Sequence, residues 1–271
     1  MQRTHHHFLT ILASTVLSCA WTGAWAQAPE PAAMQNGLHS VEAYEESNHL
    51  SAGYGDWREF GLRGITQYGD HQLSAEASNM NRFNENGNYL GLGDTLVLSP
   101  LWYASLNLGI GDGAAYLPRY RLDGFIHRKL LSDLRLVGSL GLGRYHAPDG
   151  HQDDNASLGL TYYFERPWVV QAQARQTRSQ PGRIETSQYF IAATWVHHQA
   201  TQVTGRYGWG QEGYLSLGDG LFISHFSSHQ TTLSIQHWLG QDWGLKLKLD
   251  SYHNPYYHRS GLNLGVFKDF R

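Results

Sequence analysis

Residues 134–146 read LRLVGSLGLGRYH, with leucine or glycine at every second position from Leu134 to Leu142. A period of two predicts a β-strand with one apolar and one polar face. The same alternation recurs along the chain, at 102–110, 156–164, 245–249 and 262–266. Repeated strands of this kind predict an all-β fold, an antiparallel transmembrane β-barrel of the bacterial outer membrane type with about 14 strands, or 12 as the alternative.

The N-terminal residues 1–26 predict a secretion signal. Arg3 supplies a positive start, 8–17 form a short apolar stretch, and Ala24-Trp25-Ala26 is an A-x-A cleavage site. The chain has one cysteine, Cys19, inside this segment. The mature chain is therefore predicted to contain neither a disulfide nor a thiol nucleophile.

The rest of the chain divides into a leader and a single domain. Residues 27–37 are rich in alanine, proline and glutamine and predict a flexible periplasmic leader, and 38–271 predict the barrel domain. A formal net charge of −3 excludes the basic footprint of a nucleic-acid-binding protein. Hydrophobic residues make up only 41%, as a membrane barrel allows, because only alternate strand residues face lipid.

Fourteen strand segments follow from the alternation and the turn residues. Short connections alternate with longer ones, of which 211–226 is the longest, and this asymmetry is typical of outer membrane barrels. The predicted strands are 38–48, 57–68, 71–83, 88–98, 101–112, 119–130, 133–146, 154–164, 167–178, 186–196, 200–210, 228–239, 242–252 and 260–270.

Aromatic residues gather beside the short connections. Each has the parity of its strand's apolar face, so we expect a girdle of outward rings at the periplasmic membrane interface. The predicted girdle consists of Tyr68, Trp102, Phe164, Trp168, Trp195, Trp243 and Phe270.

The opposite parity places charged residues inside the barrel. The predicted lumen-lining residues are Arg63, Glu76, Arg121, Asp123, Arg135, Arg175, Lys246 and Lys248. Two interpretations remain open. Ion pairs between these residues fill the lumen, since buried charges need partners; or the lumen is a pore whose modest basic excess favours small anionic solutes or sugars.

Five short segments carry a family resemblance. They are NYLGLG at 88–93, LPRYRL at 117–122, LGLGRY at 140–145, LTYYF at 160–164 and the closing strand at 261–270. With them, nearly the whole mature chain resembles the YaiO family of outer membrane β-barrels. The resemblance implies location and architecture, and an association with envelope or exopolysaccharide systems. It supplies no catalytic residues and no cofactor.

The expected partners follow from this location. Outer membrane lipid and lipopolysaccharide surround such a barrel, and Tyr252, Tyr256 and Tyr257 near a predicted loop tip are expected among headgroups or sugars. The segment 265–270, GVFKDF, is similar to the terminal strand that the outer-membrane assembly machinery reads, although Arg271 follows the aromatic residue. Polysaccharide or a small anionic solute is the candidate cargo, and nucleic acid is not expected.

A few residues suggest catalysis or metal binding instead. His225 and Ser227 share a face, as in an outer membrane phospholipase, and the carboxylates Asp153 and Asp154 are candidates for a protease. Histidines cluster in pairs such as His253 with His258, which suggests metal ligands without the spacing of a metal site. We expect no enzyme, metal or cofactor; the alternative is a lipid- or sugar-modifying barrel enzyme with a loop-side site.

Overall fold

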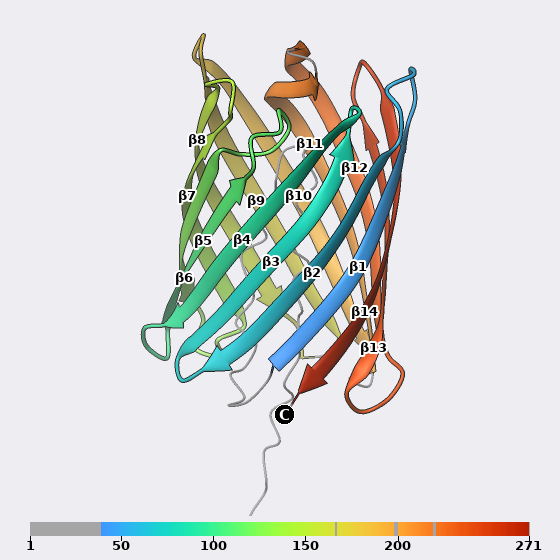
Figure 1. Cartoon of the computed structure of the whole chain (residues 1–271). Coiled ribbons are helices and arrows are strands. Elements are labelled where there is room, and N and C mark those ends of the chain that lie inside the picture. The colour runs from blue at the N-terminus through green and yellow to red at the C-terminus, as the bar shows by residue number, and fades with distance from the viewer. Residues whose placement is uncertain (1–38, 166, 198–199, 219–220, 271) are drawn as a thin grey trace, which may run out of the picture.

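The computed structural model describes residues 39–165, 167–197, 200–218 and 221–270. They form one closed barrel of 14 antiparallel strands, in which each strand pairs with its sequence neighbours and β14 pairs with β1 (Figure 1). The strands are β1 (His39–Leu50), β2 (Trp57–Tyr68), β3 (His71–Arg82), β4 (Glu85–Val97), β5 (Trp102–Gly111), β6 (Tyr120–Lys129), β7 (Leu136–His146), β8 (Gln152–Tyr163), β9 (Trp168–Gln180), β10 (Ile184–His197), β11 (Thr201–Gly218), β12 (Leu221–Trp238), β13 (Trp243–His253) and β14 (His258–Phe270). The prediction of an antiparallel barrel with about 14 strands is confirmed.

The two faces of each strand follow the sequence alternation. On β14, Leu262, Leu264 and Val266 are exposed on the outside, whereas Asn263 and Phe267 are buried inside. Because this pattern repeats around the sheet, the outer surface is a continuous apolar band and the interior is polar. This is the reverse of a soluble protein and matches a barrel surrounded by lipid.

The two ends of the barrel differ. The first strand begins and the last strand ends at the lower end in Figure 1, which also carries the turns 69–70 and 98–101. The upper end carries the longest connection, 112–119. Short periplasmic turns and longer extracellular loops are the rule for such barrels, so we assign the lower end to the periplasm.

The predicted long connection 211–226 is wrong. The strands β11 and β12 continue through it and pair as far as Gly218 and Leu221, so that both are 18 residues long and extend beyond their pairing with β10 and β13. The predicted signal peptide and leader, residues 1–26 and 27–37, lie outside the described residues. Among the described residues, no helix is long and apolar enough to span a membrane.

The aromatic residues of the predicted girdle all lie at the lower end. Tyr68, Trp102, Phe164, Trp168, Trp243 and Phe270 are exposed on the outside, and Trp195 is half-buried opposite Trp168. A second group of outward rings lies near the upper end, namely Tyr120, Tyr189, Tyr207 and Trp209. Rings at both ends of the apolar band mark the two membrane interfaces.

Inside the barrel, several aromatic rings lie over glycines of a neighbouring strand, and two examples show the arrangement. Tyr44 faces Gly61, and Phe125 faces Gly141. A Cβ atom on either glycine would overlap the facing ring. The glycines therefore let large side chains lie flat against the wall of a crowded interior.

The lipid-facing assignment predicts the effect of a charge at mid-strand. Leu158, in the middle of β8, is 59% exposed on the outside, and Leu158→Arg is expected to lower the free energy of unfolding by about 2–4 kcal/mol in bilayers. The control Asn86→Arg, at the exposed upper end of β4, is expected to cost about 1 kcal/mol or less. Urea unfolding in lipid vesicles measures both; equal costs would mean that Leu158 does not face the membrane interior.

Candidate functional site

One side of the barrel interior is filled by ion pairs between β13, β14, β1, β2 and β3. We call this region the ion-pair wall, and its side chains are buried. The pairs are Lys246–Glu42 (2.7 Å), Lys248–Glu46 (2.7 Å), Arg63–Glu76 (2.9 Å), Arg82–Glu59 (3.1 Å) and Arg259–Asp250 (2.7 Å).

Tyr44 contacts three charged side chains at the centre of the ion-pair wall. Its hydroxyl lies 2.7 Å from a carboxylate oxygen of Glu59 and 2.7 Å from one of Glu76. The guanidinium of Arg63 lies 3.9 Å from the centre of the Tyr44 ring. Buried charges that are paired and hydrogen-bonded in this way form a rigid filling.

Above the ion-pair wall, aromatic and aliphatic side chains fill the upper end. The cluster, called here the aromatic plug, consists of Leu50, Trp57, Phe83, Leu215, Phe226, Tyr252 and Tyr257. Its members come from β11 through β14 to the turn after β3, almost half of the circumference. The prediction that Tyr252 and Tyr257 lie among headgroups is wrong, because both are 2% exposed inside the barrel.

The connection 112–119 folds into the barrel, which the sequence did not predict. Tyr116 and Leu117 are buried against Met80 and Tyr89. The Tyr116 hydroxyl donates to the carbonyl oxygens of Met80 (2.9 Å) and Glu85 (3.1 Å). Burial raises the pKa of this hydroxyl, so it remains a protonated donor. We call residues 112–119 the inner loop.

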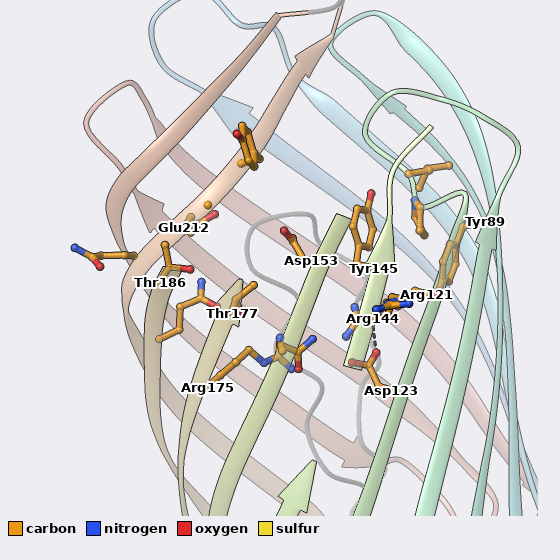
Figure 2. Close-up of a pocket in the computed structure, with 17 residues that line it drawn as sticks. Tyr89, Arg121, Asp123, Arg144, Tyr145, Asp153, Arg175, Thr177, Thr186 and Glu212 are labelled. Atoms are coloured by element: carbon orange, nitrogen blue, oxygen red, sulfur yellow. Dashed lines mark hydrogen bonds and ion pairs between the residues drawn. The ribbon is translucent and has the colours of Figure 1, made fainter. Parts of the chain in front are cut away.

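A cavity of about 110 Å³, lined by both polar and apolar groups, remains on the opposite side, between the inner loop and β11 (Figure 2). Its lining contains tyrosine rings, hydroxyls and amides, and five charged side chains: Arg121, Asp123, Asp153, Arg175 and Glu212. Arg121 pairs with Asp123, Arg175 donates to the Ser157 hydroxyl (3.3 Å), and Glu212 accepts from Tyr252 (2.8 Å). We call this space the upper cavity.

A second interior cavity, of about 60 Å³, lies nearer the lower end between β13 and β5. Glu42, Arg63, Glu76 and Lys246 line it, so it borders the ion-pair wall. We call it the lower cavity.

A single row of inward residues runs from the lining of the lower cavity to the lining of the upper cavity. Strand pairing aligns them, and we call them the polar row: Ser74, Gly93, Asn107, Asp123, Gly143, Asn155, Thr177 and Thr186. Because the strands are tilted, the row climbs from the lower end of β3 to the upper end of β10. Ser74 and Asn107 line the lower cavity, and Asn155 and Thr186 line the upper one.

The predicted basic excess of the lumen is wrong for the described residues. Carboxylates inside the barrel are Glu42, Glu46, Glu59, Glu76, Asp123, Asp153, Glu212, Asp250 and Asp269. Basic side chains inside it are Arg63, Arg82, Arg121, Arg175, Arg206, Lys246, Lys248 and Arg259. The two sets nearly balance, so the interior as a whole favours neither ion sign.

Seven of the eight predicted lumen residues point inward, on both sides of the barrel. Arg63, Glu76, Lys246 and Lys248 belong to the ion-pair wall, and Arg121, Asp123 and Arg175 to the upper cavity. The eighth, Arg135, is not in the lumen. It lies in the turn before β7 and pairs with Glu165 of the next turn (3.0 Å).

The candidate catalytic groups are not brought together. Asp153 lines the upper cavity, whereas Asp154 points outward and pairs with Arg144 (2.7 Å). His225 and Ser227 lie exposed on β12. In the described part of the chain, no group of three or more histidine, cysteine, aspartate or glutamate side chains is arranged to hold a metal ion.

Solved structures with the same fold are outer membrane channels and related barrels. The CymD monoaromatic hydrocarbon channel superposes with a TM-score of 0.58 at 8% identity, covering 88% of this chain and 89% of that chain. The COG4313 outer membrane channel from Pseudomonas putida F1 gives 0.54 at 11%, covering 88% and 97%. A bacterial polysaccharide outer membrane secretin gives 0.54 at 11%, covering 88% and 100%. At these identities the likeness concerns the fold alone.

No curated protein matches the chain. The YaiO membrane beta barrel domain matches residues 38–215, about two thirds of the sequence. The fold, its outer membrane neighbours and this match agree on an outer membrane location, and the chain belongs to the YaiO family of membrane β-barrels.

Proposed function

We propose that this barrel is a narrow, non-enzymatic channel that passes small polar solutes between its two ends. The path follows the polar row, from the lower cavity near β3 to the upper cavity near β10. The observation that carries the proposal is the register of this row, which places six polar side chains and two glycines of eight neighbouring strands in one line between the two cavities. Polar groups along such a path replace the water that a hydrophilic solute loses.

The path is eccentric and narrow because the rest of the lumen is filled. The ion-pair wall occupies the side of β13 to β3, and the aromatic plug covers it at the upper end. The near balance of interior charges favours uncharged polar solutes over anions as cargo. The link to surface polysaccharide, which the family resemblance implies, remains a prediction. Measuring the amount of exported polysaccharide in a strain that lacks this protein would test it.

A cysteine-block experiment tests the path. In a Cys19→Ser background, Asn155→Cys and Thr177→Cys place one thiol each on the polar row. A charged thiosulfonate reagent is expected to react with both and to reduce ion conductance in planar bilayers by more than half. The bulk and charge that it adds would obstruct the narrow path.

The matched control is Ser78→Cys, on the inner face of β3 and 7% exposed within the filled side. It should conduct like the parent and should not react. Equal reaction at all three positions would mean a wide, water-filled lumen. A folded barrel that conducts no ions and takes up no sugars would refute the channel.

A further inference from the structure

Three outward histidines form an aligned row near the upper end of the barrel. His229 of β12 pairs with His253 of β13, which pairs with His258 of β14. The ring centres of His229 and His253 are 4.9 Å apart, and those of His253 and His258 are 3.9 Å apart. We call these three residues the imidazole row.

The imidazole row continues the upper group of aromatic rings. Register places His229 beside Trp209, and Trp209 beside Tyr189. Tyrosine and tryptophan rings on the outside of a barrel mark the headgroup level of the membrane. At the upper end this level belongs to the outer leaflet, so the imidazoles lie where lipid headgroups carry phosphate.

Two members of the imidazole row, His253 and His258, are hydrogen-bonded to each other. The Nδ1 atoms of His253 and His258 are 2.6 Å apart, so one imidazole donates and the other, still neutral, accepts. A second proton at this pair would place two like charges in contact. An anion bound across the row would stabilise the doubly protonated pair, so anion binding and proton uptake are linked.

The surrounding charges do not neutralise the row. As far as the structure describes them, the outward faces of β12, β13 and β14 carry no carboxylate. On the neighbouring β1 side, Asp56 is engaged by His49 (2.8 Å), and Arg58 of β2 adds a positive charge. Other outward titratable groups on these and the adjoining elements are His225 and His237 of β12, Glu45 of β1, Tyr207 and Tyr256, and Glu45 lies farther down its strand, opposite Leu264.

We propose that the imidazole row is a binding site for the phosphate groups of an outer-leaflet lipid, and that it binds them more tightly as it takes up protons. Each proton taken up by an imidazole adds one positive charge to the row. Each positive charge near a lipid surface strengthens the binding of anionic headgroups roughly fivefold. The serine hydroxyls at positions 251 and 260, two residues from the row on the same faces, supply further donors.

The test measures binding of bisphosphorylated lipid A to the detergent-solubilised full chain at pH 7.5 and pH 5.5. The parent is expected to bind more tightly at pH 5.5, by about fivefold for each proton that the row takes up with the lipid. The variant His229→Gln/His253→Gln/His258→Gln is expected to lose this gain. The control His146→Gln removes an outward imidazole at the upper end of β7, stacked on Tyr120 at 5.1 Å, and should behave as the parent.

Two further arms identify the ligand. Dephosphorylated lipid A should show no gain at low pH, and inorganic phosphate alone should compete weakly because it lacks the acyl chains that the apolar band holds. The proposal is overturned if the triple variant, folded by heat-dependent gel mobility, keeps the full pH dependence. It is equally overturned if Zn²⁺ binds to the imidazole row and lipid A binding nevertheless stays unchanged.

Discussion

Replacing residues 114–117 with a Gly-Ser-Gly-Ser linker is expected to raise the single-channel conductance several-fold. The inner loop forms one side of the upper cavity through Leu117 and Pro118. Leu117 is 0% exposed, and Tyr116 is fixed by two carbonyl oxygens. A linker without these side chains has no apolar anchor inside the barrel, so the upper cavity would widen towards Tyr89 and β4.

Single-channel recordings in planar bilayers measure the effect. Tyr116→Phe is a finer variant, because it removes only the hydroxyl; we expect brief openings of larger conductance rather than a permanently wide pore. The control replaces the exposed upper turn 181–183 with Gly-Ser-Gly and should leave the conductance unchanged. An unaltered conductance in the correctly folded linker variant would mean that the narrowest point lies elsewhere, at the aromatic plug or along the polar row.

The inner loop also shows where sequence reasoning stops. A period of two assigns the faces of strands, and it predicts 12 of the 14 strands within a few residues, all but β11 and β12, because lipid and lumen impose opposite polarity on alternate positions. A connection has no such period. Residues 112–119 read DGAAYLPR, and nothing local indicates whether Tyr116 points to water or into the barrel. The position of the inner loop is explained by Gly87 and Gly111, which have no side chains and so leave space on the inner face of the barrel for the loop to pack.

Two other errors have physical causes. Residues 211–226 are predicted as a long connection, but the sequence Asp-Gly at 219–220 is typical of a two-residue hairpin, and β11 and β12 pair as far as Gly218 and Leu221. Arg135 was assigned to the lumen by extending the parity of β7 beyond its first residue, Leu136. Parity predicts a face only where the strand exists.

The predicted basic excess of the lumen is wrong for a related reason, namely that inward carboxylates of β1 are hard to recognise in the sequence. The outward positions of β1 include Glu45 and Ser47, so its alternation is weak and its inward carboxylates were not recognised. Glu42 and Glu46 supply two of the partners of the ion-pair wall. The polar row was equally hidden, because its members come from eight strands and only the register aligns them.

Removing one member of the ion-pair wall is expected to have the largest effect on stability. Arg63 is 8% exposed and contacts Glu76 (2.9 Å), Glu42 (3.7 Å) and the ring of Tyr44 (3.9 Å). In the Arg63→Ala variant, Glu42 and Glu76 remain buried but lose the positive charge of Arg63. Breaking a buried pair in this way costs about 3–5 kcal/mol, mostly as the penalty of the charge left behind.

The midpoint of urea unfolding in detergent micelles, followed by heat-dependent gel mobility, measures this loss. Arg63→Met/Glu76→Gln removes both charges at similar volume and is expected to recover at least half of the loss, because little uncompensated charge remains. Arg178→Ala breaks an exposed pair with Glu185 (3.4 Å) and should cost about 1 kcal/mol or less. If Arg63→Ala were no more costly than Arg178→Ala, water would have to reach Glu42 and Glu76 freely, and the filled side of the lumen on which the eccentric path depends would not exist.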